Sequence, residues 1–164
     1  MKHIKVSIRD LIGADVGESL PFTLESARPK LADLPKLTDL KAEGTVEQLG
    51  DRWLVKGTTT ASIKLQCVRC LKEFAYPVQA EFSEEFSRRP TEDQFPAGAT
   101  ELQLAEMLRT VILLTVPVRP LHAPDCHGLC DVCGRDLNEH PHDHPERAQA
   151  QAKENPFSKL KEKR

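Results

Sequence analysis

Residues 52–87 of the chain, RWLVKGTTTASIKLQCVRCLKEFAYPVQAEFSEEFS, contain two stretches of alternating apolar and polar residues separated by a Cys-x-x-Cys motif. A strand with one buried face shows this period of two, because successive side chains point to opposite sides of a sheet. The sequence therefore predicts a long antiparallel hairpin with one apolar face. That face carries Trp53, Val55, Ala61, Ile63 and Leu65 on the first strand and Phe74, Tyr76, Val78, Ala80, Phe82 and Phe86 on the second.

The pairing of the two strands follows if Val68 and Arg69 are the two loop residues of the hairpin. Apolar side chains then face each other, and basic side chains face acidic ones. The expected pairs are Ile63 with Phe74, Ala61 with Tyr76, Val55 with Phe82, Lys64 with Glu73 and Lys56 with Glu81. A tight turn at Leu49-Gly50-Asp51-Arg52 predicts a further strand over residues 40–49.

One helix is expected after this sheet. Thr100-Glu101-Leu102-Gln103 matches a capping box, and an apolar stripe follows until Pro117 ends the helix. The stripe consists of Leu104, Ala105, Leu108, Val111, Ile112 and Thr115. It would cover the apolar face of the sheet.

The predicted fold class is α+β: an antiparallel sheet with a long hairpin, one main packing helix, a Cys-rich zinc-knuckle segment and a flexible C-terminal tail. Residues 1–39 are expected to supply short strands and loops that pack on the sheet, including strands around Ile4 to Ile8 and Phe22 to Leu24. Residues 40–145 hold the sheet, the helix and the Cys/His-rich segment in one domain with residues 1–39. Residues 146–164 form a polar, basic tail.

Composition excludes several classes of protein. The chain has 164 residues, 39% of them hydrophobic, and a formal net charge of −2, which indicates one modest soluble domain without a general attraction for polyanions. The absence of an apolar run of 18 residues and of an apolar signal segment predicts a cytoplasmic protein with no membrane partner. In such a reducing compartment, clustered thiols are more often metal ligands than disulfides.

The five cysteines give the strongest functional signal. Paired Cys-x-x-Cys motifs bring four thiolates around one structural Zn²⁺. The preferred ligand set is Cys67, Cys70, Cys130 and Cys133, with Cys126, His142 and His144 as substitutes or ligands of a second site. A local site made of Cys126, Cys130, Cys133 and one histidine is the main alternative, and spacing leaves the choice open.

Catalysis has little support in the sequence. Neither Cys-x-x-Cys motif begins a helix in a βαβ pattern, as a thioredoxin-like redox site requires. No nucleophile elbow, His-Glu-x-x-His motif or phosphate-binding glycine loop is present. The chain is therefore expected to be a non-enzyme without a small-molecule substrate.

Several motifs in order resemble the YceD/DUF177 family. They are Cys67-Val68-Arg69-Cys70-Leu71, the leucine-rich helix ending at Pro117, Cys126 to Asn138, and Asn155-Pro156-Phe157. Members with the full cysteine pattern carry Cys-x-Cys where this chain has His142-Asp143-His144, and imidazole can replace thiolate on zinc. The resemblance implies a factor for accumulation of large-subunit (23S) ribosomal RNA, with ribosomal RNA or a pre-ribosomal particle as partner.

Direct RNA contact would need a local basic surface. The pairing above sets Lys56 and Lys64 against glutamates, so the expected contacts are the hairpin tip and the tail, namely Arg69, Lys72, Lys159, Lys161, Lys163 and Arg164. The alternative is a zinc-stabilised adaptor that binds a protein partner through Phe157 and Leu160 of the tail.

Overall fold

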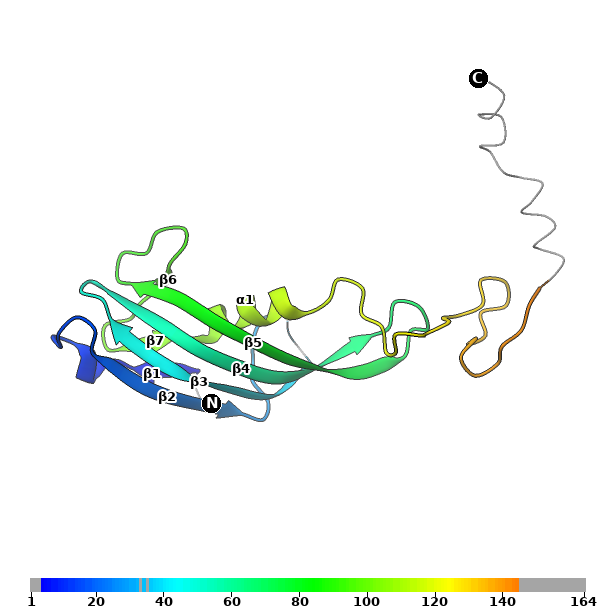
Figure 1. Cartoon of the computed structure of the whole chain (residues 1–164), viewed down its shortest axis with the longest axis horizontal. Coiled ribbons are helices and arrows are strands. Elements are labelled where there is room, and N and C mark those ends of the chain that lie inside the picture. Colours follow the sequence, from blue (N-terminus) through cyan, green and yellow to red (C-terminus); the bar gives the residue numbers. More distant parts are fainter. Residues whose placement is uncertain (1–3, 33, 35, 145–164) are drawn as a thin grey trace, which may run out of the picture.

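The computed structural model describes residues 4–32, 34 and 36–144 of the chain. Its elements, in chain order, are β1 (Lys5–Ser7), the 3-10 helix η1 (Arg9–Leu11), β2 (Ser19–Ser26), β3 (Leu37–Gln48), β4 (Arg52–Gln66), β5 (Glu73–Ser87), β6 (Phe95–Pro96), β7 (Glu101–Gln103) and α1 (Ala105–Thr115). Figure 1 shows an elongated, twisted sheet with α1 along one side and the Cys-rich segment beyond one end.

Five strands form the main sheet in the order β2-β3-β4-β5-β6. Strands β2 to β5 pair antiparallel with their neighbours, while the two-residue β6 runs parallel to β5. A separate antiparallel pair is formed by β1 and β7. The chain therefore consists mostly of antiparallel sheet with a single helix, as the alternation of residues 52–87 predicts.

The hydrophobic core lies between the sheet, α1 and the β1–β7 pair. Val46, Val55 and Phe86 of the sheet are fully buried, as are Leu108 and Ile112 of α1. Burial of apolar surface stabilises by about 25 cal/mol per Å², so this contact between layers supplies most of the driving force for the fold.

The hairpin register differs from the expected one by two residues. Leu65 lies opposite Phe74, Ile63 opposite Tyr76 and Ala61 opposite Val78. The shift arises at the tip, where the Cys67 N–H donates to the Lys72 carbonyl over 2.9 Å and leaves a four-residue loop. A shift of two keeps every side chain on its face, so the predicted apolar face is confirmed although the individual pairs are wrong.

The predicted charge pairs across the hairpin are wrong for the same reason. Lys64 lies opposite Ala75, and Lys56 lies opposite Ser83. Lys56 instead pairs with Glu47 of β3, with 3.5 Å between Nζ and Oε2, and Glu73 pairs with Lys36. The Lys36 ammonium, through its hydrogen bond and charge, lowers the pKa of Glu73.

The predicted capping box is also wrong. Glu101, Leu102 and Gln103 form β7, and the helix starts after Leu104, which makes no side-chain capping hydrogen bond. Pairing with β1 buries Leu102 completely, and that burial outweighs the weak local preference for a helix start. The predicted end is close to the observed one, because α1 stops at Thr115, two residues before Pro117.

The N-terminal strands occur where the sequence places them, as β1 and as the edge strand β2. The division into residues 1–39, 40–145 and 146–164 stays a prediction, and the tail 146–164 lies outside the described residues. Among the residues that the structure describes, no helix is long and apolar enough to cross a membrane.

Strands β3 and β4 approach each other closely at a pair of glycines. Gly44 lies directly opposite Gly57. A Cβ atom added to Gly57 would overlap the carbonyl oxygen of Glu43, and one added to Gly44 would overlap that of Lys56. Both positions therefore require glycine because the two backbones meet there.

We predict that Gly57→Ala destabilises the protein by about 2 kcal/mol, because the added methyl group forces the strands apart. The matched control is Thr60→Ala on the same strand, which removes an exposed side chain and should cost less than about 1 kcal/mol. Urea unfolding followed by circular dichroism measures both. Equal stabilities of the two variants would contradict the close approach.

Candidate metal centres

The first Cys-x-x-Cys motif forms the tip of the β4–β5 hairpin. The Leu71 N–H donates to the Cys67 carbonyl over 3.0 Å, and Leu71 adopts a φ of 62°. This curled loop turns Cys67 and Cys70 inward, so that they are 0% and 5% exposed. A flat two-residue turn would not direct both side chains to one side.

The second motif repeats this turn with glycine at the strained position. The Gly134 N–H donates to the Cys130 carbonyl over 2.8 Å, and Gly134 has a φ of 71°. The Cys130 N–H closes the loop by donating to the Arg135 carbonyl over 2.7 Å. The two motifs are therefore the same backbone structure, and each presents a pair of thiols.

Cluster one contains Cys67, Cys70, His122 and Cys126, whose ligand atoms all lie within 4.8 Å of one another. The Sγ atoms of Cys67 and Cys126 are 3.7 Å apart, and Cys70 Sγ lies 3.2 Å from His122 Nδ1. Two thiolates bound at about 2.3 Å to one tetrahedral zinc ion are separated by about 3.8 Å. The donor atoms therefore already stand near the corners of a metal-sized tetrahedron.

The thiols of cluster one differ in acidity. Burial alone raises the pKa of Cys67, but the backbone of Cys70 and the side chain of His122 stabilise its thiolate and lower the pKa to about 5. Burial raises the pKa of Cys70. Since the thiolate is the form that binds metal, Cys67 is prepared to accept an ion at neutral pH.

Cluster two contains Cys130, Cys133, His142 and His144, also with all ligand atoms within 4.8 Å of one another. Cys133 Sγ lies 3.1 Å from His142 Nε2. His144 Nε2 is buried and has no hydrogen-bond partner among the residues that the structure describes. A buried imidazole nitrogen without a partner costs free energy unless something occupies it, and a metal ion would do so.

The surroundings of cluster two also favour metal binding. Hydrogen bonds from the backbones of Cys133 and Val132 lower the pKa of Cys130 to about 6. The carbonyl of His140 lies 2.7 Å from His142 Nδ1 and raises the pKa of His142, with a further contribution from Cys130. A carbonyl that accepts from Nδ1 directs Nε2 toward the metal, as outer partners of ligating histidines commonly do. Cys133 is exposed, so this cluster is more open than cluster one.

The structure divides the preferred ligand set between the two clusters. Cys67 and Cys70 lie in cluster one, while Cys130 and Cys133 lie in cluster two. The local alternative differs as well, since Cys126 belongs to cluster one and both His142 and His144 join cluster two. Each cluster is completed by nearby side chains of the downstream segment, which explains why no single four-cysteine group forms.

His122 was not among the expected ligands. The sequence does contain a signal for it, because His122 precedes Cys126 by four positions and this spacing occurs in zinc sites. Its location in a proline-rich stretch, apart from the histidines that follow Cys133, made it less conspicuous.

Backbone contacts hold the hairpin tip to the downstream segment around cluster one. The Val68 N–H donates to the Pro120 carbonyl over 3.0 Å, and the Leu129 N–H donates to the Arg69 carbonyl over 3.1 Å. The Arg69 guanidinium donates to the Cys126 carbonyl over 2.7 Å. The tip is therefore fastened to residues some 50–60 positions later in the chain, as the metal hypothesis requires, although through a different ligand set.

Asn138 holds the loop around Cys126 in place. Its Oδ1 accepts from the His127 N–H over 2.8 Å, and its Nδ2 points to Cys126 Sγ at 3.7 Å. The Asn138 backbone and side chain donate to Asp136 over 2.8 and 2.6 Å, which lowers the pKa of that carboxyl. Asn138 thus positions the loop that carries Cys126.

Two of the residues expected to contact RNA or a protein partner lie in the described part of the chain, and five lie outside it. Arg69 and Lys72 are exposed at the hairpin tip, but both are engaged. The hydrogen bond to Glu139 and the contact with Asp136 raise the pKa of Lys72, whose Nζ lies 2.7 Å from Glu139 Oε1 and 3.4 Å from Asp136 Oδ2. The remaining residues of this set, Phe157, Lys159, Lys161, Lys163 and Arg164, lie outside the described residues.

Comparison with known proteins gives one family match. The sequence model of the family described as "Large ribosomal RNA subunit accumulation protein YceD" matches residues 55–162. The curated relatives include a protein of Mycobacterium leprae (strain TN), 30% identical over 109 residues, which are 60% of this chain and 50% of the relative. A protein of Mycobacterium bovis is 31% identical over 104 residues, or 58% of this chain and 50% of the relative.

Both relatives are named as uncharacterised proteins. The chain spans about half the length of the curated relatives it matches. No solved structure matches the chain.

We predict that Asn138→Ala loosens the loop around Cys126 without unfolding the protein. Loss of a hydrogen bond worth about 1 to 1.4 kcal/mol should speed exchange of the His127 amide roughly five- to tenfold. Asp125→Ala, an exposed change in the same loop, is the matched control and should leave the rate unchanged. Hydrogen exchange followed by NMR tests this, and equal rates in both variants would show that Asn138 does not order the loop.

Proposed function

This chain belongs to the YceD family, and from that membership we propose that it supports the accumulation of large-subunit (23S) ribosomal RNA. The observation that carries the proposal is the family match over residues 55–162, which covers β5, α1 and both metal clusters. The proposed partner is ribosomal RNA or a pre-ribosomal particle. The cytoplasm is the proposed compartment.

The proposed role is non-enzymatic. Each cluster offers four protein ligands, and four-coordinate zinc sites with only protein ligands leave no open position for a substrate or a water nucleophile. Cysteine and histidine donors in this number favour zinc over harder metals. We therefore propose two structural zinc ions, one in each cluster, where the sequence alone favours a single shared ion.

The proposed zinc ions would hold the segment after α1 in its folded position against the hairpin tip. Between Arg119 and His144 the described segment contains a single short β-bridge, Leu129 with Asp136, and its buried residues are Cys126, Gly128 and Cys130. Such a segment has too little apolar surface to fold alone, and metal binding supplies the missing free energy in domains of this kind. Cluster one would secure the segment to the hairpin, and cluster two would fold its outer loop.

For RNA contact we propose the hairpin tip together with the basic tail. Arg69 and Lys72 are exposed at the tip, although the Arg69 guanidinium also donates to the Cys126 carbonyl, and the tail adds Lys159, Lys161, Lys163 and Arg164. The ion pairs of Lys72 with Asp136 and Glu139 reduce its contribution, so the tail carries most of the proposed attraction for phosphate.

A protein-binding adaptor is the second candidate. Val68 and Leu71, in the same loop at the hairpin tip, are 50% and 53% exposed. Apolar side chains exposed near one another favour a protein surface as partner. In this case Phe157 and Leu160 of the tail would add to the contact.

We predict two zinc ions per chain. Elemental analysis of the untagged protein should give a ratio near two, and Cys126→Ser and Cys130→Ser should each lower it to about one, because each variant removes a ligand from a different cluster. Asp125→Ala is the matched control and should retain both ions. A ratio of one in the unchanged protein, or loss of all zinc in either variant, would contradict two independent centres.

Depletion of the protein in its own host should lower the ratio of 23S to 16S ribosomal RNA, and the unchanged gene should restore it. An unchanged ratio after depletion would overturn the proposed function. Complementation by a chain truncated after Glu154 tests the tail, and it should fail although the truncated protein keeps its zinc.

A salt series separates the two candidates for the partner. Affinity for 23S RNA fragments that falls steeply with salt supports direct RNA contact, because each neutralised phosphate releases counterions. A flat response, or no binding by a protein that still complements, would support the adaptor.

A further inference from the structure

The two clusters differ in how far solvent reaches their cysteines. In cluster one Cys67, Cys70 and Cys126 are 0%, 5% and 1% exposed. In cluster two Cys130 is 7% exposed, whereas Cys133 is an exposed residue and both histidines are half-buried. An oxidant in solution therefore meets cluster two first, and within that cluster it meets Cys133.

Access decides the order of oxidation once both clusters hold zinc. The thiolate, rather than the thiol, reacts with an oxidant, and a thiol that coordinates zinc is deprotonated outright. The zinc ions proposed above therefore give every cysteine of the two clusters the same ionised form. The difference that remains is burial, which shields the cysteines of cluster one and Cys130 and leaves Cys133 open to solvent.

Cys130 is placed to react with an oxidised Cys133. The ligand atoms of cluster two all lie within 4.8 Å of one another, so the two sulfurs need to approach by at most about 3 Å to form a disulfide. Gly134, directly after the pair, has a φ of 71°, and a Cβ added there would meet no atom within 4 Å. The loop belongs to no strand, so it can close on a disulfide without disturbing the sheet.

The corresponding loop of cluster one is held on both sides. It joins the paired strands β4 and β5, and its Val68 N–H and Arg69 carbonyl bond to the segment after α1 over 3.0 and 3.1 Å. Closing a disulfide between Cys67 and Cys70 would move the hairpin tip against these contacts. The Sγ atoms of Cys67 and Cys126 are only 3.7 Å apart, but both residues are buried and shielded from an oxidant.

We propose that Cys133 is a site of oxidation by hydrogen peroxide, with Cys130 as its resolving partner. The Cys133 thiolate attacks one peroxide oxygen, which forms the S–O bond of a sulfenic acid while the O–O bond breaks and hydroxide leaves. The Cys130 thiolate then attacks that sulfur, which forms the disulfide while the S–O bond breaks and a second hydroxide leaves. Two electrons pass from the thiolates to the peroxide, and each hydroxide takes a proton from the solvent.

The disulfide removes two of the four ligands of cluster two. His142 and His144 then remain, and the zinc ion is released because a structural site needs four ligands. Cluster one keeps its buried ligands and its ion. Zinc release rests on the proposed function, which assigns an ion to each cluster, whereas the exposure of Cys133 is a property of the chain alone. Residues 146–164 follow cluster two closely in the sequence, so oxidation acts on the segment that leads into the basic tail.

The intact, zinc-loaded protein provides the test. Hydrogen peroxide should release one zinc ion per chain about tenfold faster than the second, because only one cluster is open to it. A chromophoric zinc chelator follows the release. The protein is then unfolded, its remaining thiols are alkylated, and mass spectrometry of its peptides should find Cys130 joined to Cys133 and the other three cysteines alkylated. Dithiothreitol with added zinc should restore both ions.

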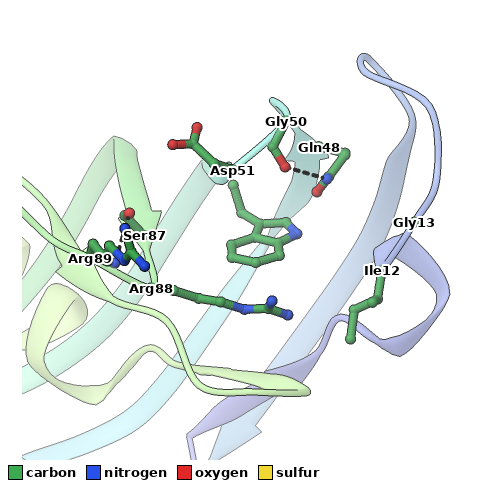
Figure 2. Close-up of a pocket in the computed structure, with 9 residues that line it drawn as sticks. Ile12, Gly13, Gln48, Gly50, Asp51, Ser87, Arg88 and Arg89 are labelled. Atoms are coloured by element: carbon green, nitrogen blue, oxygen red, sulfur yellow. Dashed lines mark hydrogen bonds between the residues drawn. The ribbon is translucent and has the colours of Figure 1, made fainter.

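Tryptophan fluorescence shows whether the sheet stays folded during this reaction. The single tryptophan of the chain, Trp53, is 3% exposed. It lines a cavity beside Gln48 and Arg88, where β3 ends and β4 begins (Figure 2), whereas the hairpin tip follows the last residue of β4. The emission should therefore stay unchanged while cluster two is oxidised. A shift to longer wavelength together with zinc release would attribute the release to unfolding and overturn the proposal.

Cys133→His tests the assigned thiol, because it keeps four ligands at an exposed position and removes the sulfur. It should slow the first zinc release about tenfold, since imidazole is not oxidised by this route. Asp125→Ala, exposed and outside both ligand sets, is the matched control and should react like the unchanged protein. If Cys133→His fails to hold the second ion, the disulfide found in the unchanged protein still decides the question.

The outcomes are distinct from those of the proposed function. Fast release of one ion together with the disulfide between Cys130 and Cys133 supports the proposal. Release of both ions at one rate, earlier oxidation of any cysteine of cluster one, or undiminished release from Cys133→His overturns it. Protein isolated without zinc would contradict the proposed metal centres, and the order of cysteine oxidation would still test Cys133. An unchanged level of 23S RNA after depletion would remove the proposed function and leave this chemistry in place.

Discussion

The arrangement of this molecule depends on the contact between the β4–β5 hairpin tip and the segment that carries His122 and Cys126. Four buried or half-buried donor atoms meet there, and backbone hydrogen bonds surround them. Buried thiols near an imidazole, one of them with its pKa lowered to about 5, are costly to maintain without an ion. With the proposed ion bound, the same groups would form the strongest link between the sheet and a segment that has almost no apolar core.

The two Cys-x-x-Cys loops show how one local structure serves two environments. In the hairpin the left-handed position is occupied by Leu71, and the paired strands on both sides hold it in that conformation. In the downstream loop no such strands exist, and Gly134 takes the position at little conformational cost. The choice of residue therefore follows from how much of the turn is imposed by its neighbours.

Much of the fold follows from the period of the hydrophobic residues. The alternation in residues 52–87 predicts the hairpin and its buried face correctly, because those depend only on the direction of each side chain. The exact pairs depend on the loop length, and the curled turn at Cys67 adds two residues that no alternation reveals. The capping-box prediction is wrong for a similar reason, since those residues form β7, whose partner is β1, almost 100 positions earlier.

The candidate site was predictable to the same degree. Residue type and spacing identify the members of the two Cys/His clusters other than His122, because thiol pairs have few other roles in such a chain. Their division into two clusters depends on how the segment after Pro120 folds back, which is a matter of backbone hydrogen bonds rather than of composition.

The length of β4 has a geometric consequence. Its 15 residues, at about 3.4 Å each, span roughly 50 Å, and β3 and β5 pair with it along most of that distance. A central strand that is hydrogen-bonded to a neighbour on each side bends little, so the two ends of the sheet keep a fixed separation (Figure 1). A partner that touches both ends at once must itself be at least this large, a scale met by folded ribosomal RNA and by few free metabolites.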